Sequence, residues 1–132
     1  MIPFRLTAQS GVPIYEQAVY AATRAIVTGQ MRVGDSFPSV RVLSRELKIN
    51  PNTAHKVIAQ LLSDGLIESR PGIGTVVAKR PGSSSTARAA LLNRRIEELV
   101  VEAKRLSIDR DAVIAAIEKH WLRLSDRQEA CK

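Results

Sequence analysis

The side chains best suited to recognising another molecule are concentrated in one short segment near the middle of the chain. The segment supplies two amides, a hydroxyl, an imidazole and an ammonium group, from Asn50, Asn52, Thr53, His55 and Lys56. An asparagine can pair with adenine through two hydrogen bonds, a threonine methyl can contact the thymine methyl, and a lysine can contact a phosphate. This combination favours recognition of DNA by the exposed first turn of a helix.

Two short helices joined by a tight turn are expected to position this segment. Ser39 is a good N-cap for the first helix, because its hydroxyl can accept a hydrogen bond from a free backbone N–H. Residues 48–49 form the turn, Asn50 caps the next helix, and Pro51 takes its first position, where a missing N–H costs nothing. Apolar residues at helical spacing predict the inner face of the first helix: Val40, Leu43 and Leu47.

The helix that begins after Asn50 is expected to extend to about Asp64, with Gly65 closing it in a left-handed conformation. Its predicted inner face consists of Ala54, Val57, Ile58 and Leu61, with Leu62 beside them. Its predicted outer face is polar and consists of Asn52, His55, Lys56 and Gln60. The side chains that suit DNA would therefore point into solvent.

Further elements are expected on both sides of this helix pair. An earlier helix over about residues 13–28 has a predicted buried stripe of Ile14, Ala18, Ala21, Ala22, Ala25 and Ile26. Residues 66–70 and 75–79 predict two short strands, joined by a turn over residues 71–74. A winged helix-turn-helix has this order of elements, three helices followed by a hairpin. The expected fold class is mainly α with a small β-hairpin.

The charge balance agrees with a polyanionic partner. Twenty Lys and Arg against 13 acids give a net charge of +7, of which residues 1–82 contribute +5 (ten bases, five acids). A single cysteine, Cys131, excludes a disulfide framework within one chain and fits a reducing compartment. The sequence shows no membrane-spanning apolar run, no signal-peptide pattern and no metal-ligand spacing, so a cytoplasmic protein without cofactor or metal is expected.

An enzyme is not expected, because no catalytic arrangement is visible. His55 and His120 belong to different predicted modules, and the chain has no paired-carboxylate, Cys–His or phosphate-loop pattern. A winged-helix module that binds another protein is the alternative to a DNA-binding one. The polar face of Asn52, His55 and Lys56 argues against it, since protein-binding surfaces favour exposed aromatic residues.

The last third of the chain predicts a separate helical module. We divide the chain into a winged domain over residues 1–80, a serine-rich linker over 81–86 and a module over 87–132. The module has two apolar seams, one of Leu92, Ile96, Leu99, Ala103 and Leu106, and one of Val113, Ile114, Ile117, Trp121 and Leu124. About 45 residues cannot build an independent core. Either a second copy covers the seams, which we favour, or the winged domain of the same chain does.

Six landmarks in order resemble the DNA-binding domain of the GntR family of bacterial transcriptional regulators. They are residues 12–17, 29–35, 37–44, 50–53, 64–67 and 72–77, and the resemblance covers about residues 10–80. The short helical tail is similar to that of the YtrA-like subfamily. The resemblance implies a dimerisation role for the tail and genes that accompany ABC-transporter operons. Phe37 stands where the family usually has leucine, which is expected to alter core packing only.

The resemblance also implies which residues contact DNA. Arg41 matches a position where family members use arginine against DNA, and His55 matches a contact position usually occupied by arginine. Ser39 either caps its helix and also contacts a phosphate, or is a cap alone, and Asn50 is likewise either a DNA contact or purely a cap. In the hairpin, Arg70 and the backbone of Gly72 and Gly74 suit the minor groove, although a tight turn would require the glycines anyway.

The predicted function is therefore a sequence-specific transcriptional regulator, a repressor that binds an inverted-repeat operator as a homodimer. The expected partners are double-stranded DNA and a second copy of the chain. No interaction with a membrane is expected. A small-molecule effector, the operator sequence and the regulated genes are left open by the sequence.

Overall fold

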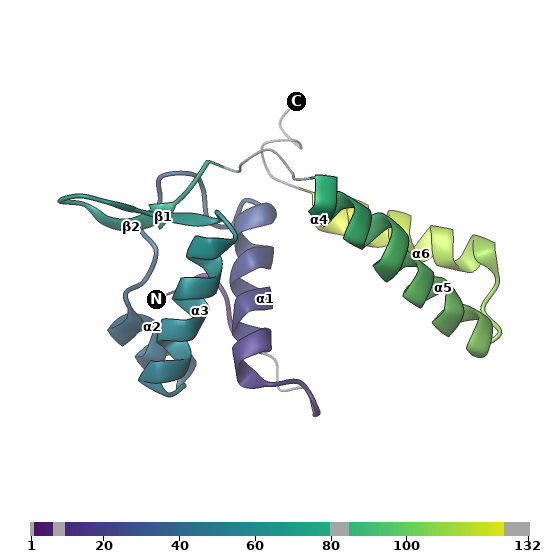
Figure 1. The fold of residues 1–132 in the computed structure, drawn as a ribbon, viewed down its shortest axis with the longest axis horizontal. Helices are drawn as coiled ribbons and strands as arrows, with labels where there is room; N and C mark the ends of the chain where they lie inside the picture. The colour runs from purple at the N-terminus through teal and green to yellow at the C-terminus, as the bar shows by residue number, and fades with distance from the viewer. Residues whose placement is uncertain (1, 7–9, 80–84, 126–132) are drawn as a thin grey trace. The chain divides into compact units, whose positions relative to one another are not determined.

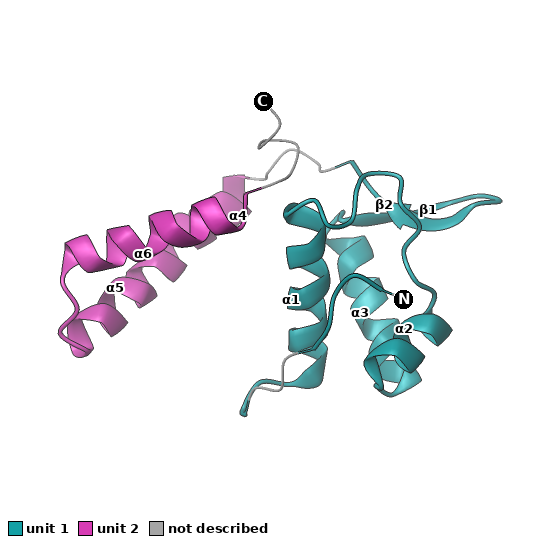
Figure 2. Ribbon diagram, turned by 180° about the vertical axis from the view of Figure 1, so that it is seen from behind, with its two compact units in different colours: residues 1–81, 126–132 teal, residues 82–125 magenta. Residues whose placement is uncertain are grey.

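The computed structural model describes residues 2–6, 10–79 and 85–125 (Figure 1). The described residues fall into two compact units, one before position 82 and one from Ser85 to Ser125 (Figure 2). Helix α1 spans Ile14–Val27, α2 spans Val40–Leu47 and α3 spans Pro51–Ser63. Among the described residues, no helix is long and apolar enough to cross a bilayer.

Helix α1 places most of its predicted stripe in the core. Ala18, Ala22, Ala25 and Ile26 are buried, and Gly29 follows the helix with a φ of 82°. Ile14 was wrongly assigned to this stripe. The helix begins at Ile14, so its side chain lies at the end of the stripe, where it is 47% exposed.

The predicted caps of α2 and α3 are confirmed. The Ser39 hydroxyl accepts a hydrogen bond from the N–H of Val42 at 3.2 Å. The side-chain oxygen of Asn50 accepts one from the N–H of Asn52 at 2.8 Å, and Pro51 stands at the first position of α3. Between the helices, Lys48 adopts a left-handed conformation with a φ of 56°. The chain therefore reverses within the short turn that the sequence predicted.

The hairpin, called the wing below, consists of β1 (Ile67–Arg70) and β2 (Gly74–Val77). The strands pair antiparallel, with Ile67 opposite Val77 and Arg70 opposite Gly74. Both are shorter than predicted, because Leu66 and residues 78–79 lie outside the ladder. The connector before α2 binds the wing, since the N–H of Phe37 donates to the carbonyl of Thr75 at 2.8 Å.

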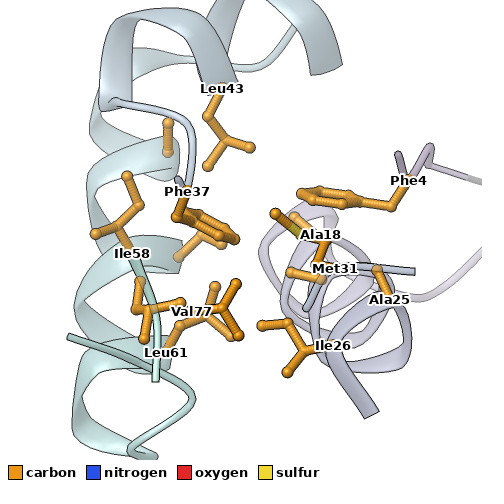
Figure 3. Packing of buried hydrophobic residues seen from close by; sticks show 14 residues of the cluster. Phe4, Ala18, Ala25, Ile26, Met31, Phe37, Leu43, Ile58, Leu61 and Val77 are labelled. Atoms are coloured by element: carbon orange, nitrogen blue, oxygen red, sulfur yellow. The ribbon is translucent and has the colours of Figure 1, made fainter. Parts of the chain in front are cut away.

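A hydrophobic core joins all parts of the first unit (Figure 3). Helix α3 contributes Ala54, Val57, Ile58 and Leu61, as predicted, and α2 contributes Leu43. Val40 and Leu47 of α2 are half-buried against the same core. Phe37 is buried and stacks on Phe4, with ring centroids 6.2 Å apart. The aromatic side chain at position 37 therefore packs against a residue that precedes all three helices.

The second unit is a helical hairpin. Its first arm comprises α4 (Ser85–Ala89), the π-helical segment η1 (Ala90–Arg95) and α5 (Ile96–Arg105), and its second arm is α6 (Arg110–Arg123). The side chain of Asp109 accepts a hydrogen bond from the N–H of Ala112 at 2.8 Å, which confirms the predicted cap. The first arm begins at Ser85, inside the segment expected to be a linker, and residues 81–84 of that segment lie outside the described residues.

Candidate nucleic-acid interface

Arg41 occupies the first turn of α2, two residues after the cap Ser39. The residue is exposed, and its side chain forms no ion pair within the described part of the chain. Leu43, two positions on, is fully buried and anchors the helix in the core. The guanidinium of Arg41 is therefore available to an anionic ligand, while the helix that bears it is fixed.

The first turns of α3 separate polar from apolar side chains as the sequence predicted. Asn52, His55 and Lys56 are exposed, and Thr53 is half-buried. Ala54 and Val57, which alternate with them, have no exposed surface. Asn50 is also exposed, but its side-chain oxygen is engaged as the cap. The amide of Asn52, the imidazole of His55 and the ammonium of Lys56 thus face solvent from a rigidly packed helix.

Gln60 lies on the predicted outer face of α3 but is not free in solvent. It is half-buried, because its side-chain oxygen accepts a 3.0 Å hydrogen bond from the hydroxyl of Tyr15 on α1. Its nitrogen donates to a carboxylate oxygen of Asp64 at 2.9 Å. Helical spacing placed Gln60 on the polar side correctly, but only the packing of α1 beside α3 shows that the side chain has protein partners.

The wing carries one predicted cation, Arg70, and this side chain is already engaged. Its Nη2 lies 2.8 Å from Oε1 of Glu68, and its Nε donates to the same oxygen at 3.1 Å. Both side chains are 46% exposed, so solvent screens the pair and it contributes little to stability. A phosphate could replace Glu68 at small cost, but Arg70 is not free in the way that Arg41 is.

The two glycines of the wing are explained by backbone conformation. Gly72 has a φ of 76° and Gly74 a φ of 104°, values that side chains with a Cβ rarely adopt. Added Cβ atoms would meet nothing within 4 Å at either position. The turn itself therefore requires glycine. Sequence reasoning overlooked Ile73 between them, which is 67% exposed at the tip of the wing; its apolar character next to two glycines was the available signal.

The electrostatics of α2 and α3 favour an anionic ligand. Helix α3 contains no acidic residue, and the positive end of its helix dipole lies at the N-terminus, beside the exposed Asn52. Arg41, Arg45 and Lys48 are exposed on the preceding helix and turn. Together with Lys56 they give this pair of helices a cationic surface suited to a phosphate backbone.

Three helices, an exposed polar turn on the third and an antiparallel wing define a winged helix-turn-helix protein. The model of bacterial regulatory proteins of the gntR family matches residues 14–77. The HTH-type transcriptional repressor YtrA of Bacillus subtilis (strain 168) is 31% identical over 121 residues, 90% of this chain and 88% of the relative. The chain therefore belongs to the GntR family of bacterial transcriptional regulators, in its YtrA-like subfamily.

Two solved structures extend the comparison. A transcriptional antiterminator from Listeria monocytogenes EGD-e has the same fold, with a TM-score of 0.81 and 23% identity over 93% of this chain and 92% of that one. The AraR(DBD) in complex with operator ORX1 has a TM-score of 0.50 and 27% identity over 56% of this chain and 94% of that one. The predicted fold class and family are confirmed, and the chain is a DNA-binding transcriptional regulator of a non-enzymatic family.

Proposed function

We propose that this regulator is a repressor that binds an inverted-repeat operator as a homodimer. The observation that carries the proposal is the outward exposure of Arg41, Asn52 and His55 from two helices that are anchored in one core. In this proposal residues 1–80 bind DNA and residues 87–132 hold two copies together. The resemblance to the YtrA-like subfamily makes an ABC-transporter operon the expected target.

Each exposed side chain of the helix pair has a defined role in the proposal. Helix α3 enters the major groove, where the Asn52 amide pairs with an adenine and His55 contacts a base edge. Arg41 grips a phosphate or a guanine, and Lys56 contacts a phosphate. Thr53 offers its methyl group to a thymine. The wing follows the adjacent minor groove with the backbone of Gly72 and Gly74.

The caps support these contacts indirectly. Ser39 and Asn50 satisfy the first N–H groups of α2 and α3, which fixes the direction in which each helix leaves the turn. The hydroxyl of Ser39 still has its proton to donate to a phosphate oxygen. The Asn50 amide nitrogen is likewise left for DNA.

The second unit supports dimerisation through its exposed apolar surface. Along the first arm, Ala103 alone among the seam residues is buried within the chain. Five large side chains of the seams are 38–53% exposed: Ile96, Leu99, Leu106, Ile114 and Ile117. Leu92 and Trp121 are more exposed still, at 59% and 74%, and Val113 and Leu124 are half-buried. A soluble monomer rarely leaves such a continuous apolar surface open, so we infer that a second copy covers it.

A mobility-shift assay tests the proposal. Purified protein is expected to prefer an inverted repeat near its own gene over the same DNA with one half-site scrambled. Four to eight phosphate contacts per dimer predict a slope of roughly −4 to −7 in a plot of log affinity against log salt. Absence of any sequence preference, together with a flat salt response, would favour a module that binds another protein.

A further inference from the structure

The first unit contains a cavity that none of the proposed DNA contacts uses. Its volume is about 680 Å³, and it lies between the N-terminal segment over residues 2–5 and one side of α1. The residues that line it include Phe4, Arg5, Tyr20 and Arg24. This volume lies within the range of pockets that bind small organic molecules.

The charged residues described around the cavity are both positive. They are Arg5 and Arg24, and no acidic residue within the described ranges lines it. Within the described ranges neither arginine side chain forms an ion pair or a hydrogen bond. Two guanidinium groups at one cavity repel each other weakly unless an anion lies between them, and a guanidinium binds carboxylate and phosphate oxygens through two parallel hydrogen bonds.

The rest of the lining points to an organic anion rather than an inorganic one. Ile2, Pro3, Phe4 and Ala21 provide an apolar wall, while Tyr20 and Gln30 offer further hydrogen-bonding groups. Apolar walls with a few polar groups are typical of sites for small metabolites. We propose that this cavity binds a small organic anion, with its carboxylate or phosphate on Arg5 and Arg24 and its apolar part against Phe4.

The wall of the cavity is connected to the helix that bears Arg41. Phe4 lines the cavity and also stacks on Phe37, and both rings are at least 94% buried. Phe37 lies two residues before Ser39, the cap of α2. The backbone N–H of Phe37 donates a hydrogen bond to the carbonyl of Thr75 in the wing. A ligand that displaces the Phe4 ring therefore also shifts the connector before α2, because the Phe4 and Phe37 rings pack against each other in a dense core.

Binding is tested by adding phenyl phosphate to the full chain and recording the NMR signals of the backbone amides at each concentration. Signals of residues 2–5, Tyr20 and Arg24 are expected to shift, and benzyl alcohol, which lacks the charge, is expected to bind far more weakly. The R5Q/R24Q double variant is expected to lose about tenfold or more in affinity for each arginine. R32Q removes an exposed arginine of the same unit outside the cavity and should bind as the unmodified chain does.

Binding that persists unchanged in R5Q/R24Q, or no binding at all, overturns the assignment. The outcome in which the two arginines contact DNA phosphates instead is distinguishable, because R5Q/R24Q would then lower the salt slope of operator binding by about 0.9 per lost contact. That result also overturns the ligand site.

The coupling step rests on the proposed DNA binding and has its own measurement. Saturating phenyl phosphate is expected to change operator affinity about 5- to 150-fold, the usual range for coupled sites. An unchanged affinity would overturn the coupling. A chain that binds phenyl phosphate but no operator would instead contradict the proposed function and leave the cavity assignment intact.

Discussion

The hydroxyl of Tyr15 donates a 3.0 Å hydrogen bond to the side-chain oxygen of Gln60 and thereby joins α1 to α3. These residues are 45 positions apart in sequence. Gln60 passes the connection on to Asp64, the C-cap of α3, through a 2.9 Å hydrogen bond. The orientation of the DNA-facing helix is therefore held by polar contacts at its C-terminal half as well as by the core beneath it.

Removal of the Tyr15 hydroxyl is expected to weaken this connection. Tyr15→Phe leaves the Gln60 oxygen without its protein donor, and the free energy of unfolding should fall by about 0.5–1.5 kcal/mol. Urea denaturation measures the change. Tyr20→Phe is the matched control, because Tyr20 is 65% exposed and its hydroxyl makes no hydrogen bond within the described residues. Equal stability of the two variants would contradict a structural role for the Tyr15 contact.

Substitution of Asn50 and of Asn52 distinguishes the effect of helix capping from the effect of DNA contact. Asn50→Ala removes the cap of α3 and should lower the free energy of unfolding by about 1 kcal/mol. Asn52→Ala leaves the cap in place, since only the backbone N–H of Asn52 takes part in it. We expect Asn52→Ala to keep normal stability and to lose operator affinity, with the largest loss for adenine at one base position. Thermal unfolding and mobility shifts on permuted operators measure both properties.

Arg41 and His55 are expected to contribute to DNA binding and not to the stability of the fold. Both side chains are exposed, so Arg41→Ala and His55→Ala should each reduce operator affinity about tenfold or more without loss of fold or dimer. Arg32→Ala removes an exposed arginine outside the proposed interface and serves as the control. Circular dichroism and size-exclusion chromatography accompany the binding assay. Unfolding of either variant would show that the position is structural.

The proposed dimer interface is tested by placing a charge on the face of α5 that carries the apolar seam. Leu99→Asp introduces a carboxylate into the proposed interface, and a buried unpaired charge is costly, so the protein should become monomeric. Val101→Asp makes the same kind of change on the same helix outside the seam, at a side chain that is 60% exposed, and should remain dimeric. Analytical ultracentrifugation measures the mass. If unmodified protein is already a monomer, the proposed dimer is wrong.

Local chemistry explains why much of the fold was predictable. Ser39, Asn50 and Asp109 were recognised as caps because their short side chains reach backbone N–H groups two or three residues ahead. The inner face of α3 followed from helical spacing in the same way. The exposure of Asn52, His55 and Lys56 needed no knowledge of distant residues.

Other features depended on contacts between distant segments. The hydrogen bond between Tyr15 and Gln60 joins residues 45 positions apart and had no periodic signal in the sequence. The stack of Phe4 on Phe37 joins residues on either side of α1 and is equally invisible to local patterns. The cavity that carries the further inference arises from that same packing.

The amino-acid sequence thus determined the order of elements, their caps, the polar face of α3 and the family. The caps and the polar face depend on residues within a few positions of one another, where backbone geometry leaves few choices, and the family follows from the order of six such short segments. Tertiary structure alone decided that Gln60 is tied to α1 and that Arg5 and Arg24 share a cavity. These results depend on how side chains far apart in sequence fill one densely packed interior, which no local pattern specifies.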